Sequence, residues 1–150
     1  MDKFLDIFQN KILFASLASY LLAQIIKICI VLIKEKRLDL RLMFASGGMP
    51  SSHSSIVTTL FILTGLYSGW TSNLTAITFI LAIIVMYDAT GVRRAAGEQA
   101  KVLNEIIEMV EHRRMITGEK LKELLGHTPV QVFAGSALGI AVALVAYYLI

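Results

Sequence analysis

The 150-residue sequence contains few charged residues and a single cysteine, and both shortages exclude whole classes of protein. Charged residues make up 17% and hydrophobic residues 56%, which is too apolar for a soluble domain of this length. Cys29 has no second cysteine with which to form an internal disulfide. The net charge of +3 is modest, which argues against nucleic acid as a partner. What remains is one membrane-embedded domain that covers residues 1–150.

Apolar runs predict four helices that cross the membrane. Two of the runs contain 22 residues each, and a helix of that length spans a hydrocarbon core of about 30 Å. The last run carries Gly135 and Gly139 in a G-x-x-x-G pattern, which favours close helix packing. We expect an all-α polytopic bundle, because lipid offers no partners to unpaired backbone groups. The four predicted spans are residues 12–33, 54–70, 74–87 and 129–150.

Between the third and fourth spans, residues 98–125 predict a charged helical hairpin at one face of the bundle. The segment carries six glutamates and five lysines or arginines. Leu103, Ile106 and Val110 are spaced as one apolar stripe, as in an amphipathic helix. Gly118 marks the expected turn of the hairpin.

The positions of the basic residues predict the orientation in the membrane. The connector at 34–53 holds four and the connector at 88–127 holds seven, which is eleven of the 14 lysines and arginines. The opposite side holds Lys3 and Lys11. Cytoplasmic loops carry the excess of basic residues, so we expect both connectors in the cytoplasm and both termini on the other side. The predicted location is the plasma membrane of a bacterium.

One stretch, residues 46–55, is free of charge and rich in glycine and serine. Gly48 lets the backbone approach a ligand, and Ser51 and Ser52 offer hydroxyls and amides at the start of a helix, where an oxyanion is favoured. His53 can exchange a proton near neutral pH. The stretch therefore predicts a phosphate cradle with an acid or base attached. The alternative is a loop that caps an ordinary helix.

Further polar side chains fall at the same predicted membrane face. Lys27 lies in the first span, Asp88 at the end of the third, and His127 just before the fourth. Arg93 and Arg94 follow the third span. Basic groups can hold phosphate oxygens while two histidines divide the nucleophile and proton-donor roles, so the set suits phosphoryl transfer without a metal. The alternatives are that Lys27 extends to the membrane surface and that Asp88 forms an ion pair with one of the arginines.

Four motifs in order resemble the divergent branch of the type 2 phosphatidic acid phosphatase superfamily, which is related to acid phosphatases and vanadium haloperoxidases. They are AQIIK, SGGMPSSHS, MYDATGVRRAAGEQA and LGHTPVQV, and they span nearly the whole chain. The resemblance implies that His127 is the nucleophile that forms a phosphohistidine and that His53 protonates the leaving oxygen. It also implies that Ser51, the amide of Ser52 and Lys27 hold phosphate oxygens.

The sequence departs from the superfamily pattern at several positions. The first motif lacks its Arg-Pro, Gln131 replaces the aspartate that orients the nucleophilic histidine, and Leu121 stands where an arginine is expected. Gln131 can fix the ring by a hydrogen bond but cannot stabilise an imidazolium as a carboxylate does. Arg93 or Arg94 could replace the missing arginines, and Asp88 could supply the missing carboxylate.

The function predicted is a lipid phosphatase that uses neither metal nor cofactor. Its substrate would be a lipid phosphomonoester or diphosphate, such as phosphatidate, phosphatidylglycerophosphate or a polyprenyl diphosphate. The alternative is a non-catalytic protein that keeps the cradle to bind anionic lipid or to scaffold partners. A CDP-alcohol phosphotransferase is disfavoured, because no aspartate follows Asp88 to hold the metal that this chemistry needs. The expected partners are the lipid phosphate, the bilayer and further copies in a homo-oligomer.

Overall fold

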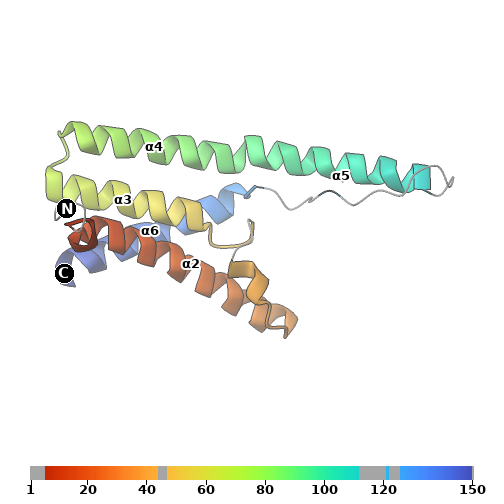
Figure 1. Cartoon of the computed structure of the whole chain (residues 1–150), viewed down its shortest axis with the longest axis horizontal. Coiled ribbons are helices and arrows are strands. Elements are labelled where there is room, and N and C mark those ends of the chain that lie inside the picture. Colours follow the sequence, from red (N-terminus) through yellow and green to blue (C-terminus); the bar gives the residue numbers. More distant parts are fainter. Residues whose placement is uncertain (1–5, 44–46, 112–120, 122–125, 150) are drawn as a thin grey trace.

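The computed structural model describes residues 6–43, 47–111, 121 and 126–149. Within these residues every regular element is a helix, which confirms the predicted all-α fold. Four helices pack side by side, and a fifth continues beyond them (Figure 1). The helices are α2 (Lys11–Glu35), α3 (Ser52–Ser68), α4 (Asn73–Thr90), α5 (Val92–Glu111) and α6 (Pro129–Leu149), with short 3-10 helices η1 (Asp6–Gln9) and η2 (Leu40–Met43).

Three helical segments of the described chain are long and apolar enough to cross a membrane. They are α2, α6 and the run Asn73–Met109 that joins α4 to α5. The remaining helix, α3, has 17 residues, which at about 1.5 Å per residue gives roughly 26 Å, close to the thickness of the hydrocarbon core. It contacts α2, α4 and α6, so it occupies the centre of the bundle.

The two ends of the bundle differ in what they carry. The described chain starts and finishes at the same end as the α3–α4 turn, as Figure 1 shows. The opposite end gathers the C-terminus of α2, the N-termini of α3 and α6, and the passage from α4 to α5. Most of the polar residues singled out in the sequence lie near this second end. We call it the site end.

The central helix packs through small polar residues as well as through the apolar Val57 and Leu63. Ser54, Ser55, Thr58 and Thr59 of α3 are all buried. The hydroxyl of Ser55 meets that of Ser19 on α2. Thr59 Oγ1 lies 2.9 Å from the Ser55 carbonyl oxygen of its own helix and 3.0 Å from the Gly139 carbonyl oxygen of α6. Small polar residues let helices approach closely and hydrogen-bond across the contact, which stabilises helix association in lipid.

The G-x-x-x-G pair of α6 lies directly on this polar face. A side chain at Gly135 would collide with the Ser51 carbonyl oxygen. A Cβ at Gly139 would lie 2.9 Å from Cβ of Thr58 and still nearer to the Ser55 carbonyl oxygen. Both glycines are therefore required because backbone atoms of α3 occupy the space that a side chain would need.

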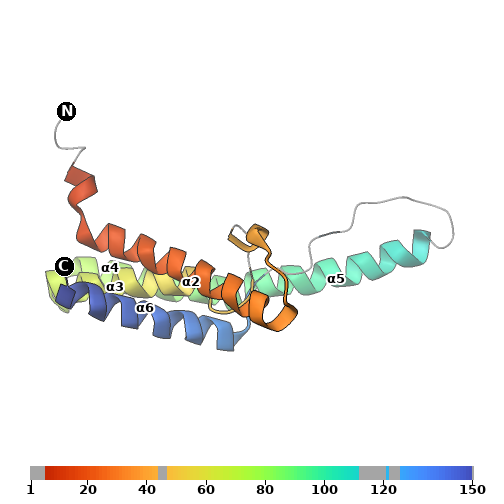
Figure 2. The same ribbon diagram turned by 90° about the horizontal axis from the view of Figure 1, so that it is seen from below.

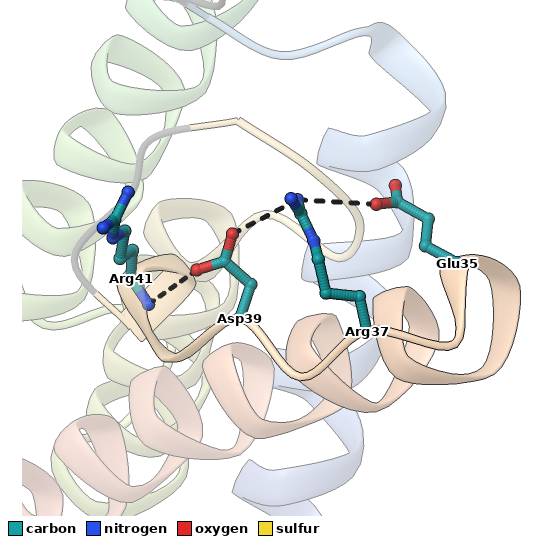
Figure 3. A network of polar contacts seen from close by, with 4 residues as sticks. All are labelled: Glu35, Arg37, Asp39 and Arg41. Atoms are coloured by element: carbon teal, nitrogen blue, oxygen red, sulfur yellow. Dashed lines mark hydrogen bonds and ion pairs between the residues drawn. The ribbon is translucent and has the colours of Figure 1, made fainter.

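The charged connector that follows α2 is held together by its own side chains (Figure 3). The Arg37 guanidinium lies 3.7 Å from the Glu35 carboxylate and 3.3 Å from the Asp39 carboxylate. The second oxygen of Asp39 accepts a 3.1 Å hydrogen bond from the Arg41 backbone at the start of η2. These charges are thus paired within the connector.

Gly91 interrupts the long run from α4 to α5 without turning it aside. Its N–H donates to the Tyr87 carbonyl at 2.8 Å, and its own carbonyl accepts from Ala95 at 2.9 Å. Hydrogen bonds of this i to i−4 pattern carry the helix direction through the interruption. Figures 1 and 2 both show α5 continuing the line of α4 and projecting past the site end.

The structure describes only part of the predicted hairpin. Its first arm is α5, whereas residues 112–120 and 122–125, with Gly118, lie outside the described residues. Leu121 is described and is not helical. The buried amide of Asn104 binds it on both sides, accepting from the Leu121 N–H and donating to its carbonyl at 2.8 Å each. The chain therefore returns alongside α5 at this point.

Candidate active site: a histidine pair at the end of the bundle

The first turn of α6 is closed by a reciprocal pair of hydrogen bonds. The Thr128 backbone N–H donates to Gln131 Oε1 at 3.1 Å, and the Gln131 N–H donates to Thr128 Oγ1 at 3.4 Å. Pro129, the first residue of α6, has no N–H that would need a partner. This is a capping box, in which side chains accept hydrogen bonds from backbone N–H groups that have no partner within the first turn of the helix.

The same Gln131 side chain also sets the protonation of His127. Gln131 Oε1 lies 3.1 Å from His127 Nδ1. A backbone N–H can only donate, so the Gln131 atom that faces Thr128 is the oxygen, and an amide oxygen only accepts. His127 Nδ1 must then carry the proton, which leaves the lone pair of the neutral ring on Nε2. The cap of α6 thereby selects the tautomer that a nucleophilic histidine requires.

The main chain of His127 is anchored to a different helix. Its backbone N–H donates to the Ala89 carbonyl oxygen at 2.8 Å. Ala89 lies in the last turn of α4, where carbonyls lack partners from their own helix. His127 is 4% exposed, so both its ring and its backbone are fixed inside the structure. The position of the ring is determined jointly by α4 and α6.

A second histidine faces the first from the central helix. His53 is the second residue of α3. Its ring centroid lies 6.3 Å from that of His127, and the two ring planes are inclined by 59°. At this distance one tetrahedral group could contact both rings. The pair therefore has the spacing needed for two histidines to act on the same phosphate.

Ser51 joins the start of α3 to the start of α6. Its N–H donates to the Gln131 carbonyl at 3.0 Å, and its hydroxyl oxygen accepts from the Ser54 N–H at 3.3 Å and the Ser54 hydroxyl at 3.0 Å. The residue is fully buried. The structure thus places Ser51 as the N-cap of α3, with its amide engaged by α6. The amide of the buried Ser52 belongs to the first turn of α3, where N–H groups point out of the helix end.

Lys27 is enclosed beneath the glycine loop that leads to α3. The side chain is 2% exposed although it is charged in solution. Its carbon stem packs against Gly48, where a Cβ would lie 3.1 Å from Lys27 Cδ. Gly48 also has φ +79°, a conformation that favours glycine. One turn earlier, Gln24 Nε2 donates to the Met43 carbonyl at 2.9 Å and ties η2 to α2.

The remaining predicted residues lie around this core at different distances from it. Asp88 is half-buried in the last turn of α4, next in sequence to Ala89, which anchors His127. Arg94 Nε forms a 3.1 Å ion pair with Glu98 on the exposed side of α5, so its described contact is with its own helix. Arg93 belongs to the first turn of α5, and its side chain is outside the described part of the structure.

Two residues that position His127 were not singled out from the sequence. Thr128 could have been found, because T-P-V-Q combines a capping threonine, a proline at the first helical position and a glutamine two residues after that proline. Ala89 acts through its carbonyl, which every residue possesses, so no side-chain signal could have found it. Only the approach of α4 to α6 makes that oxygen a partner.

These observations define an all-helical membrane protein with a histidine pair at one end of its bundle. The model of the divergent PAP2 family matches residues 8–142, and the chain belongs to that family. This confirms the resemblance found in the motifs. The chain is 42% identical to the uncharacterized membrane protein YuiD of Bacillus subtilis (strain 168), over 96% of this chain and 98% of that protein. No solved structure matches the chain.

Proposed function

We propose that this protein is a lipid phosphatase whose nucleophile is His127. The observation that carries the proposal is the buried ring of His127, held by Gln131 in the tautomer with its lone pair on Nε2 and facing His53 at 6.3 Å. A nucleophile fixed by a third group beside a proton donor is the arrangement that covalent catalysis requires. Membership of the divergent PAP2 family supports the same chemistry.

In the first step, Nε2 of His127 attacks phosphorus and the bond from phosphorus to the lipid oxygen breaks. Protonated His53 gives its proton to that departing oxygen, so the lipid leaves as an alcohol or, from a diphosphate, as a monophosphate. The product on the enzyme is a phosphohistidine at position 127.

In the second step, a water molecule attacks the phosphohistidine. His53, now neutral, takes a proton from that water, and the nitrogen–phosphorus bond breaks. Inorganic phosphate leaves, His127 recovers its lone pair and His53 is protonated for the next cycle.

The charge that develops on the phosphate oxygens needs fixed partners. The N-terminus of α3 supplies amides and the positive end of a helix dipole, with Ser52 and His53 in its first turn. Lys27 and the Gly48 loop lie on the α2 side of that terminus. We assign the phosphate oxygens to these groups, with Arg93 as a further basic residue at the start of α5. Electrostatic stabilisation of this kind lowers the barrier without a metal ion.

The site end should face the cytoplasm, because eleven of the 14 lysines and arginines lie in the two connectors at that end. In a Cys29→Ser background, a cysteine at Lys101 should then resist an impermeant thiol reagent in intact cells, whereas one at Asn73 should react. The reverse labelling pattern would overturn this orientation.

A second function, anionic-lipid binding without catalysis, is favoured by one observation. Gln131 carries no charge with which to stabilise an imidazolium, and its oxygen is shared between His127 and Thr128. A protein that only binds lipid phosphate would need the cradle but not the nucleophile.

Phosphate release by the purified protein in detergent separates the two functions. We expect release from at least one member of a panel of phosphatidate, phosphatidylglycerophosphate and polyprenyl diphosphates. His127→Ala should lower turnover by at least the roughly 10² to 10⁴-fold typical of a positioned catalytic group. His112→Ala, the third histidine of the sequence, is the matched control and should leave turnover unchanged. Activity that survives His127→Ala, or that a chelator removes, would refute the mechanism.

Gln131→Asp sharpens the same assay. An aspartate that reaches Nδ1 would hold the same tautomer and also stabilise the imidazolium, so turnover should rise or be preserved. Gln131→Leu removes the hydrogen bond to His127 and should lower turnover. Equal loss in both variants would mean that Gln131 does not orient His127.

A further inference from the structure

The helix that projects past the site end carries an exposed stripe with a heptad spacing. Six positions on α5 alternate in steps of three and four residues, the a and d pattern of a coiled coil. Four of the six are apolar and large, and they are 46 to 63% exposed. The β-branched Val92 and Ile106 stand at a positions. The a positions are Val92, Gln99 and Ile106, and the d positions are Ala95, Val102 and Met109.

The chain that returns alongside α5 does not cover this stripe at the point where it is described. Leu121 is fastened to Asn104, on the far side of the helix from the stripe. Gly97 and Ala100 on that same side are buried, whereas all six stripe positions are exposed. Among the residues that the structure describes, α5 therefore has one packed face and one exposed apolar face.

The exposed face has a shallow depression where a coiled coil would form. This open depression of about 540 Å³ is lined by Ala95, Glu98, Gln99, Val102 and Leu103. The first four of these are consecutive d, g, a and d positions. In a parallel coiled coil, such a set of four surrounds the a-position side chain of the facing helix. The side chain that would enter here is the partner's Gln99.

A lipid surface does not fit this face. The helical run Asn73–Met109 has 37 residues, or about 55 Å, so its far part must extend beyond a hydrocarbon core of about 30 Å. That part continues the direction of the membrane helix α4 instead of turning onto the bilayer (Figure 2). Surface-bound helices carry a lysine- and arginine-rich polar face, but α5 has four glutamates against three basic residues and no aromatic residue.

We infer that two copies of this chain pair through α5 as a parallel, in-register coiled coil. Both copies have the same orientation in the membrane, so their α5 helices must run in the same direction. Gln99 then faces the partner's Gln99, and a polar residue at one a position fixes register. Glu98 at a g position faces the partner's Leu103 at e, so no like charges meet at the edge of this layer.

The area of the stripe is sufficient for such a dimer. The exposed side chains would bury on the order of 500 Å² in each copy, or about 1,000 Å² in total, which is where specific interfaces begin. Confinement to one bilayer adds a high effective concentration. The inference does not depend on the proposed phosphatase reaction.

Disulfide trapping tests the pairing in the full-length protein. In a Cys29→Ser background, Val102→Cys places thiols at facing d positions, and Lys101→Cys places them on the outer side of the same turn. Under mild oxidation in membranes, we expect roughly tenfold more dimer from Val102→Cys, because disulfides need Cα atoms within about 7 Å. Equal trapping at both positions, or none at 102, would overturn the inference.

A second measurement covers the case in which the thiol variant misfolds. Ile106→Lys places a charge in the stripe and should shift the detergent-solubilised protein from dimer to monomer in sedimentation. Glu105→Lys, one residue away and outside the a and d positions, should leave the dimer intact. A dimer that persists in Ile106→Lys, or a wild-type protein that sediments as a monomer, would refute the pairing.

Discussion

The central helix α3 and its neighbour α4 have nearly the same length, 17 and 18 residues, but opposite surroundings. Serines and threonines of α3 are buried against three helices, whereas leucines, isoleucines and phenylalanine of α4 are exposed. In water, apolar side chains would be buried and polar ones exposed, because burial of apolar surface drives folding there. In lipid the apolar side chains lose nothing by facing outward. Small size and the capacity to hydrogen-bond therefore favour α3 at the centre, where it also buries Leu63.

Substitutions on α3 and α4 should differ most in their effect on turnover. His53 on α3 is proposed to protonate the leaving oxygen, so His53→Ala should lower turnover by roughly 10² to 10⁴-fold on a lipid phosphate. An aryl phosphate with a stable phenolate product needs less protonation and should lose less. Thr78→Ala on α4 is the control. An equal loss on both substrates would show that His53 does not act as the acid.

The next difference should be in packing. Gly139→Val would drive a side chain into the backbone of α3 at Ser55, so the free energy of unfolding should fall by about 1–3 kcal/mol. Ala141→Val, on the exposed side of the same helix, should change it little. Unfolding in mixed detergent micelles measures both. Similar stabilities would mean that α3 and α6 are not in close contact.

The smallest difference should come from a single hydroxyl. Thr59→Val keeps the shape of the side chain but removes the hydroxyl that lies 3.0 Å from the Gly139 carbonyl. Hydrogen bonds between membrane helices average about 0.6 kcal/mol, so the loss should be of that order. Thr78→Val on α4 removes a hydroxyl that bonds only within its own helix, 3.0 Å from the Leu74 carbonyl, and should cost less. The same unfolding assay compares them.

Local pattern predicted much of the fold because its causes are local. The apolar runs 12–33 and 129–150 correspond to α2 and α6 within two residues at each end. The second predicted span begins two residues after α3 does, since Ser51 rather than a later residue supplies the cap. The third predicted span, 74–87, ends before α4 does, because Asp88 and Thr90 are still helical at the membrane boundary.

The candidate site was predictable as a set of residues but not as a geometry. The motif resemblance pointed to His53, His127 and Gln131. It did not indicate that Ser51 is engaged by α6, or that the His127 backbone is anchored to α4. Those contacts depend on where two helix ends meet, which short-range spacing does not encode. The contact between Gln131 and Thr128 is local, and the T-P-V-Q pattern could have revealed it.

The sequence by itself determined that the chain is a helical membrane protein of this family. Long apolar runs leave the backbone no partner but itself, and the ordered motifs carry the family signal through side chains alone. The tertiary structure decided which helix is central and where His127 is held. Both depend on hydrogen bonds between residues distant in sequence, such as Thr59 with Gly139 and Ala89 with His127. Such bonds exist only after the helices have packed, because each partner is an ordinary backbone or hydroxyl group until another helix brings its counterpart within reach.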